Sequence, residues 1–165
     1  MKKWLGMISS AVMGVLAFVF LAISNFFTKM SYASGSQSET VSGYELIKES
    51  TENAPKGFGL YKAFTIIMII VAVLLLAWAV VMLLNNLNVL KLKFNLNLVN
   101  TILLAVFAVV VLVAFIALIV MGVDTSTSAL GMKITAGPAV GAYLNLVLAL
   151  AACAGGVVAL VKKKV

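Results

Sequence analysis

The sequence predicts an all-α membrane protein, built as a bundle of four transmembrane helices with a small extracellular cap. Three observations predict this class. Of the 165 residues, 64% are hydrophobic and 10% are charged, whereas a soluble domain is about half apolar and about a quarter charged. The chain contains four long apolar runs without a charged residue. Polar, lysine-containing segments separate these runs.

Each of the four runs is long enough to cross a membrane. A helix needs about 20 apolar residues to span a hydrocarbon core of about 30 Å, and a backbone in lipid must pair its polar groups within the segment. We therefore expect a single four-span membrane domain over residues 1–165. The expected spans are about 4–27, 63–84, 98–123 and 137–161, with outer loops at about 28–62 and 124–136 and an inner loop at about 85–97.

The first run could instead be a secretory signal peptide. Lys2 and Lys3 give it a basic start, and residues 31–33, Ser-Tyr-Ala, resemble a small-residue cleavage site. However, the apolar run from 4 to 27 is longer than the about 7–15 residues of a signal core. We expect the segment to be retained as the first transmembrane helix.

The charged residues divide unevenly between the two sides of the expected bundle. One side receives five lysines and all five acids, whereas the other has lysines only and carries the whole net charge of +7. Short cytoplasmic loops carry an excess of lysine, so we expect a multi-pass protein of the plasma membrane with both termini in the cytoplasm. Lysines at anionic headgroups contribute about 1 kcal/mol each. The expected membrane-surface anchors are Lys2, Lys3, Lys91, Lys93, Lys162, Lys163 and Lys164.

The first outer loop contains the sequence VSGYELIKES at residues 41–50. Ser42 and Glu45 have the spacing of a capping box, in which each side chain pairs with the other residue's backbone N–H. Val41 and Leu46 have the spacing of the hydrophobic staple that accompanies such a start. The pattern predicts a short outer-cap helix over about 43–51. The alternative is a solvated loop that contains the same spacing by chance.

Two further side chains complete the predicted outer-cap helix. Tyr44 and Ile47 are three residues apart and share a face with Leu46. We expect the preceding Ser- and Gly-rich residues 31–40 to be flexible. Residues 133–135 are compatible with a brief strand, which no other feature of the sequence supports. The inner segment 90–98 alternates apolar and polar residues, and we favour a membrane-surface turn with extended lysines over a strand.

Small residues recur every four positions in the first and fourth spans. Such stripes let helices approach closely, and an asparagine within one can hydrogen-bond across the contact. Whether these contacts lie within one chain or between chains is left open by the sequence. The third span has no such stripe, and we expect it to face lipid. The expected helix-packing residues are Gly6, Ser10, Gly14, Gly137, Gly141, Asn145 and Ala149, and Cys153 continues the fourth-span stripe.

The chain has the composition of a non-enzymatic protein. No Asp, Glu, Lys, Arg or His lies within an expected span, which argues against ion-coupled transport and intramembrane proteolysis, because both use such groups. The chain has no His, and the single cysteine, Cys153, lies in an apolar run. A nucleophile paired with a base is therefore not expected. We expect no catalytic residue, cofactor or metal.

The order of these features resembles the small, uncharacterised four-span membrane proteins of Gram-positive bacteria and mollicutes. In that group a Ser/Gly-rich segment follows the first span and precedes a motif that corresponds here to residues 42–46, SGYEL. The resemblance implies no known activity. The topology also looks like that of claudins, but the Gly-Leu-Trp pattern and paired cysteines of their first outer loop are absent. A claudin function is therefore not carried over.

These observations favour an accessory or structural subunit that acts through helix–helix and extracellular-loop contacts. Its partners would be the lipid bilayer and either another membrane protein or further copies of itself, and no nucleic acid. One alternative is a homo-oligomeric pore or channel. A second alternative is a membrane-embedded toxin-immunity protein. Candidate lining residues for a pore are Ser9, Ser10, Thr65, Thr101 and Asn145.

Overall fold

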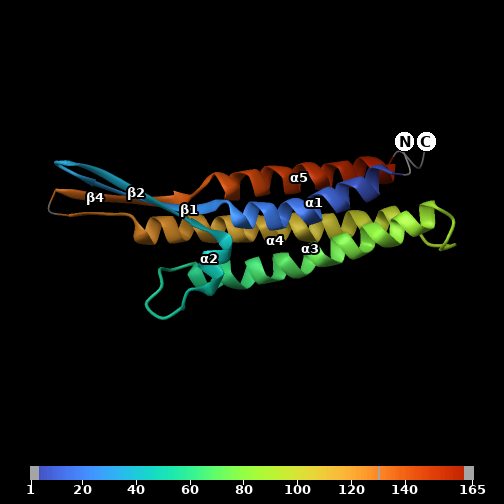
Figure 1. The fold of residues 1–165 in the computed structure, drawn as a ribbon, viewed down its shortest axis with the longest axis horizontal. Coiled ribbons are helices and arrows are strands. Elements are labelled where there is room, and N and C mark those ends of the chain that lie inside the picture. Colours follow the sequence, from blue (N-terminus) through green and yellow to red (C-terminus); the bar gives the residue numbers. More distant parts are fainter. Residues whose placement is uncertain (1–3, 130, 162–165) are drawn as a thin grey trace.

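The structure is a computed structural model that describes residues 4–129 and 131–161. Four long helices run side by side along the molecule, and a narrow β-sheet extends from one end of them (Figure 1). The first and last of these helices begin and end at the opposite end from the sheet. The elements are α1 (Leu5–Ala22), β1 (Ser24–Tyr32), β2 (Gly35–Ser42), α2 (Gly43–Lys48), α3 (Phe58–Asn86), α4 (Leu96–Thr125), β3 (Thr127–Ala129), β4 (Met132–Pro138) and α5 (Val140–Val161).

The four long helices α1, α3, α4 and α5 are each long and apolar enough to cross a membrane. They occupy the four predicted spans, with shifted ends. At about 1.5 Å per residue, the 29 residues of α3 and the 30 residues of α4 exceed the thickness of a hydrocarbon core. The outward faces of the bundle expose branched apolar side chains, as lipid contact requires, among them Ile70, Val80, Ile102, Val109 and Val147.

The expectation that the third span faces lipid is wrong. In its most apolar stretch α4 is 44% buried, the largest share of the four helices, whereas α5 is only 22% buried. Leu104 and Phe107 of α4 are fully buried and belong to the main core, together with Leu75 of α3 and Ala149 of α5. Lipid tails are as apolar as leucine, so an unbroken apolar composition does not distinguish a lipid-facing helix from a central one.

The all-α prediction is also wrong, because both predicted outer loops form strands. The four strands make one antiparallel sheet in the order β2-β1-β4-β3. The central pair joins the two loops: Phe26 lies opposite Pro138, and Met30 lies opposite Ile134. The segment 31–40, expected to be flexible, forms the tip of the hairpin β1-β2 and most of β2. The brief strand at 133–135 is present as part of β4.

The predicted first span is too long at its end. Helix α1 ends at Ala22, and the apolar Phe26 and Phe27 belong to β1. Asn25 accounts for the change, because its amide nitrogen donates to the carbonyl of Phe20 at 2.7 Å and to that of Ile23 at 2.8 Å. Carbonyls at a helix end need such partners. The β1–β2 register also shifts between Ser24 and Phe26, so the chain leaves the helix through an irregular first turn of the strand.

The turn between α3 and α4 lies at the opposite end from the sheet. Residues 87–95 contain no strand, in agreement with the predicted turn. Asn88 has a positive φ of 59°, a conformation that asparagine tolerates. The side chain of Asn85 accepts from the backbone N–H of Leu92 at 3.1 Å, and that of Asn95 caps the start of α4. The asparagines of this segment therefore shape the turn.

Candidate interaction surface

One face of the β-sheet carries an apolar cluster at its far end, beside the polar Thr28, Gln37 and Glu39, and the other face is mainly polar. Side chains alternate between the faces of a strand, and the register places Phe26, Met30 and Tyr32 of β1 on the same face as Ile134 and Met132 of β4. Phe26 is buried against the ends of α2 and α4. Beyond the end of α4 no described helix covers the sheet (Figure 1). The uncovered apolar residues, here called the tip cluster, are Met30, Tyr32, Met132 and Ile134.

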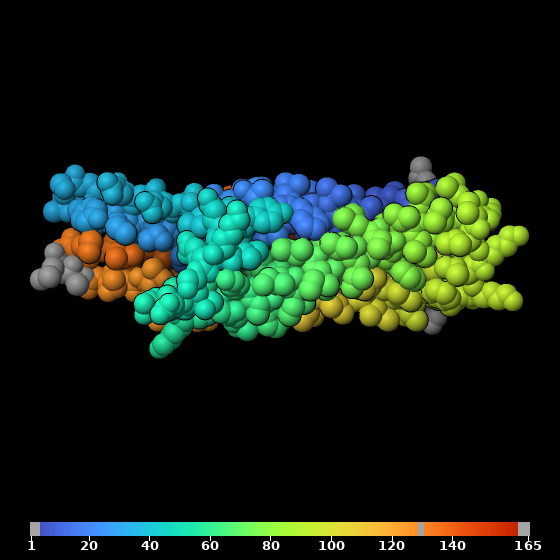
Figure 2. Space-filling model, turned by 60° about the horizontal axis from the view of Figure 1, so that its bottom comes forward, coloured from blue at the N-terminus to red at the C-terminus, as the bar shows by residue number. Residues whose placement is uncertain are grey.

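The tip cluster is accessible but ordered by local contacts. Tyr32 is 42% exposed, and Met30, Met132 and Ile134 are half-buried. The hydroxyl of Tyr32 donates to the sulfur of Met30 at 3.4 Å. The space-filling view shows the sheet extending from one end of the bundle, past the loop that follows α2 (Figure 2).

The opposite face of the sheet is polar. Apart from Phe27 near the bundle, its side chains are hydroxyl groups and lysines, and no acid lies on it. Lys29 lies between Ser38 of β2 and Thr135 of β4, and Ser31 lies opposite Lys133. Both lysines are exposed. The two faces therefore differ: one carries the apolar tip cluster and Glu39, and the other carries two exposed lysines.

Strand β2 forms an open edge of the sheet. It pairs only with β1, and residues 35–40 are exposed on both faces. Natural edge strands are commonly shortened or carry lysine or proline against pairing with another chain. β2 is eight residues long, contains neither residue type and has one charge, Glu39. The opposite edge, β3, has three residues.

The outer-cap helix is present as α2 and ends at Lys48, before the predicted position 51. Ser42 and Glu45 form the full capping box: the Ser42 backbone N–H donates to the Glu45 carboxylate at 2.8 Å, and the Glu45 N–H donates to the Ser42 hydroxyl at 3.3 Å. Donation from the Ser42 backbone, followed by that from its hydroxyl, holds the pKa of Glu45 below its usual value. The cap is therefore strongest while Glu45 is ionised.

The apolar residues of α2 face the bundle. Leu46 is 3% exposed and packs in the same cluster as Val41, the residue that precedes the cap. The hydroxyl of Tyr44 donates to the carbonyl of Phe18 in α1 at 3.3 Å. Ile47 is half-buried. These residues fasten α2 to the bundle, so they are not available as a docking surface. The loop 49–57 that follows protrudes beside the bundle (Figures 1 and 2).

The small residues predicted to pack helices are used within the chain. A Cβ atom at Gly14 would lie 2.7 Å from Leu76 of α3, and one at Gly141 would lie 2.8 Å from the carbonyl oxygen of Ser24. A Cβ at Gly6 would lie 3.0 Å from the side chain of Asn97. Ala149 is fully buried in the main core. Gly137, predicted to lie in the fourth span, is in β4 instead.

Asn100 makes hydrogen bonds between helices of the bundle that were not predicted from the sequence. The buried Asn100 of α4 accepts from the hydroxyl of Ser10 and donates to the carbonyl of Gly6 at 3.0 Å. It therefore ties α4 to α1 at two points. An isolated asparagine in an otherwise apolar run was the available signal, because such a group in a membrane span seeks a partner on another helix.

The residues suggested for a pore lining do not share one surface. Ser10, Thr65 and Asn145 are buried in the bundle. The hydroxyl of Thr101 donates to carbonyls of Asn97 at 2.8 Å and of Gly156 at 3.0 Å, and the hydroxyl of Ser9 donates to that of Leu5. Cys153 is half-buried beside the main core.

Two of the expected lysine anchors lie in the part of the chain that the structure describes. Lys91 and Lys93 are exposed in the turn between α3 and α4, at the end away from the sheet. Lys2, Lys3, Lys162, Lys163 and Lys164 lie outside the described residues. Over residues 4–129 and 131–161, no group of three or more His, Cys, Asp or Glu side chains has the arrangement of a metal site.

Comparison with models of protein families gives no match, and comparison with curated proteins gives none either.

Proposed function

We propose that this chain is a non-enzymatic accessory or structural subunit of a membrane, and that it contacts another membrane protein, or further copies of itself, through the sheet. The observation that carries the proposal is the tip cluster, which is apolar, ordered and uncovered. It lies beyond the ends of the long helices, and in the proposed orientation this places it outside the hydrocarbon core. Exposed apolar patches outside lipid commonly mark protein contacts.

The open edge of β2 supports the same proposal. Its backbone groups on the outer side are free to pair with an added strand, which is one of the common ways in which extended segments bind to sheets. The edge and the tip cluster belong to the same sheet, since Met30 lies opposite Gln37 of β2. A partner can therefore contact the tip cluster and the edge together.

The sheet, rather than the helix stripes, is the proposed contact because the stripes are occupied within the chain. Gly14 and Gly141 touch neighbouring elements so closely that a second helix has no access to them. We therefore keep the predicted contact through the extracellular loops. We no longer propose that the small-residue stripes bind a partner. The buried positions of Ser10, Thr65 and Asn145 lend no support to a pore lined by these residues, and no observation favours an immunity protein.

The proposed orientation places the sheet outside the cell and both termini in the cytoplasm, with the protein in the plasma membrane. Lys91 and Lys93 lie at the end away from the sheet, and short cytoplasmic loops carry lysine. The described acids lie at the sheet end or in its flanking loops, including Glu39, Glu49 and Asp124.

The test is the mass and composition of the protein after gentle extraction in native lipid particles. We expect a complex containing another protein or further copies. The double substitution Met30→Thr and Ile134→Thr should remove that component, because it makes the tip cluster polar while keeping β-compatible side chains. The matched control is Thr135→Ser, on the opposite face of the same strand. A single copy in the unaltered protein, or a complex that survives the double substitution, would contradict the proposal.

A further inference from the structure

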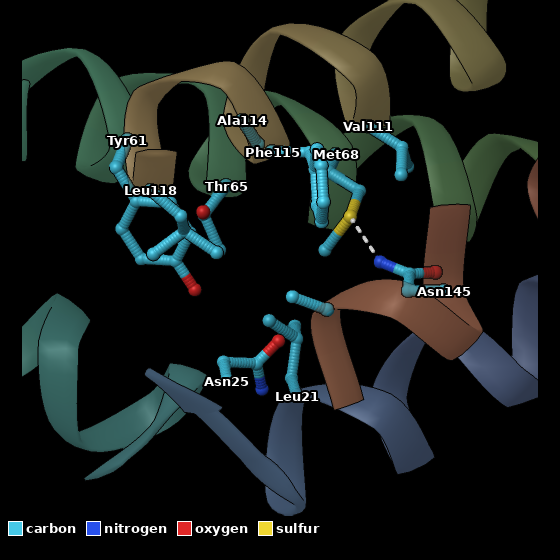
Figure 3. Close-up of a pocket in the computed structure, with 11 residues that line it drawn as sticks. Leu21, Asn25, Tyr61, Thr65, Met68, Val111, Ala114, Phe115, Leu118 and Asn145 are labelled. Atoms are coloured by element: carbon cyan, nitrogen blue, oxygen red, sulfur yellow. Dashed lines mark hydrogen bonds between the residues drawn. The ribbon is translucent and has the colours of Figure 1, made fainter. Parts of the chain in front are cut away.

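A small cavity lies inside the bundle near its sheet end, where α1, α3, α4 and α5 meet (Figure 3). Its volume is about 20 Å³, which is enough for one water molecule, since about 10–15 Å³ is needed. Most of its walls are apolar, including Leu21, Met68 and Leu118. Four polar side chains also line it: Asn25, Tyr61, Thr65 and Asn145.

The hydroxyl of Thr65 is the key feature of this cavity. Thr65 is 1% exposed, and its hydroxyl makes no hydrogen bond of standard geometry with the described residues. The Tyr61 hydroxyl lies close enough to interact with it, so a direct bond between the two is the alternative to a bridging water. Hydroxyls in helices usually donate to the carbonyl four residues earlier. Thr101 does so, as do Ser9 and Ser126. Thr65 makes no such bond, although the burial of an unpaired hydroxyl costs free energy.

Other polar atoms face the same space. Figure 3 shows the Tyr61 hydroxyl and the Asn25 amide oxygen pointing into the gap between α3 and the end of α1. The amide nitrogen of Asn25 is already used by the carbonyls of Phe20 and Ile23, which leaves its oxygen directed to the cavity. On another wall the amide nitrogen of Asn145 donates to the sulfur of Met68 at 3.3 Å, and its oxygen has no partner among the described residues.

We propose that this cavity is a binding site for one internal water molecule, held by the hydroxyl of Thr65 together with the Tyr61 hydroxyl and the Asn25 oxygen. Water fits this set because it both donates and accepts, and a buried water makes about three hydrogen bonds. A cation is a poorer fit, because all four polar side chains are neutral and no carboxylate lines the cavity. The water links α3 to the junction of α1 and β1, and so helps to fix the base of the sheet.

The first test is Thr65→Val, which removes the hydroxyl and nearly preserves the shape. If the hydroxyl binds water, the substitution removes one of the water's partners, and the melting temperature in lipid nanodiscs should fall by about 2–4 °C. If the hydroxyl is buried without a partner, the apolar replacement should leave the melting temperature unchanged or raise it. Either of these last two results would overturn the proposal. The matched control is Thr135→Val, at an exposed position of β4, with little expected change.

The second test separates water from a direct contact between Thr65 and Tyr61. A high-resolution experimental structure should show a solvent peak within hydrogen-bond distance of the Thr65 hydroxyl, and this peak should be lost or weakened in Thr65→Val. In a cycle with Tyr61→Phe, the doubly substituted protein should lose less than the sum of the two single losses. A direct bond between Thr65 and Tyr61 would couple the two substitutions as well, so the solvent peak is the observation that assigns the coupling to a shared water. A fall in melting temperature without any solvent peak would also overturn the proposal.

Discussion

Gly141 lies where α5 passes close to the start of the sheet. A Cβ atom there would lie 2.8 Å from the carbonyl oxygen of Ser24 and 3.1 Å from that of Phe20. These two atoms are backbone groups at the end of α1 and the beginning of β1, so they have little freedom to move. The absence of a side chain at position 141 therefore sets the distance between α1 and α5.

We expect Gly141→Ala to destabilise the protein by about 1–3 kcal/mol, the usual cost of overpacking. The control is Gly59→Ala at the start of α3, where a Cβ would meet nothing within 4 Å. There alanine should be neutral or stabilise by up to about 1 kcal/mol. Thermal unfolding in nanodiscs measures both. Equal stability of the two variants would contradict the close approach at Gly141.

The neighbouring serines of α1 provide a second comparison. Ser10 donates to Asn100 of α4, whereas Ser9 donates to the carbonyl of Leu5 in its own helix. We expect Ser10→Ala to cost about 0.6–2 kcal/mol, the range for hydrogen bonds between membrane helices, and Ser9→Ala to cost much less. The free energy of unfolding of the two variants tests this difference. A larger loss from Ser9→Ala would show that the interhelical bond does not stabilise the bundle.

At the level of elements, α2 depends on its first residues because six residues are too few for a stable isolated helix. Its capping box and the burial of Leu46 hold it in place. Ser42→Ala should weaken it by about 1 kcal/mol. The readout is hydrogen-exchange protection over residues 43–48, with Ser50→Ala, beyond the end of α2, as the control. Unchanged protection in Ser42→Ala would contradict the role of the cap.

The same capping box makes α2 sensitive to acid. The pKa of Glu45 is lowered from its usual 4.5, so the ionised group stabilises the folded state above that pH. This contribution is lost as pH falls through the lowered pKa. The melting temperature of the unaltered protein should exceed that of Glu45→Gln at pH 7, and the difference should shrink as the pH falls below 4.5. A difference that stays constant with pH would contradict the assignment.

The helices of this fold could be predicted from the sequence, but the sheet could not. Apolar length locates all four spans, and Ser42 with Glu45 locates the start of α2. The pairing of β1 with β4 joins segments more than 100 residues apart, which local patterns do not report. β2 has the sequence GSQSETVS, with Val41 as its only large apolar residue. Its extended form comes from pairing with β1 rather than from intrinsic preference.

The candidate surfaces show the same division. The stripes containing Gly14 and Gly141 could be recognised from their spacing, but only the structure assigns them to contacts within one chain. The tip cluster could not be predicted, because Met30 and Tyr32 come together with Met132 and Ile134 only through the register of β1 with β4. Ser10, which donates to Asn100, could not be predicted as its partner either, because it lies 90 residues earlier in the chain.

At the scale of the whole molecule, the proposed orientation makes a labelling prediction. Cys153 is the only cysteine, so a Cys153→Ala background allows one new thiol at a time. Ser36→Cys at the sheet should react with a membrane-impermeant maleimide on intact cells. Lys91→Cys, in the turn at the other end, should react only after the membrane is permeabilised. The reverse pattern would place the sheet in the cytoplasm and contradict the orientation.

The whole molecule presents two kinds of apolar surface. The surface of the bundle is apolar, as expected of membrane-spanning helices, with exposed residues such as Val147 of α5, whereas the tip cluster lies beyond the helices without a cover. The central claim is that protein contacts are made at the second surface. It explains why the sheet exposes an apolar cluster although the small-residue stripes of the bundle are already used in contacts within the chain.

Site-specific photo-cross-linking in intact membranes tests this claim most directly. A photoreactive aromatic amino acid at position 32, in place of Tyr32, would be compared with the same group at position 147, in place of Val147. Both native side chains are exposed, at 42% and 60% respectively. Cross-links to a protein from position 32, with little or none from position 147, are the predicted result. Cross-links from position 147 alone would contradict the account and place the contact on the membrane-embedded face of α5.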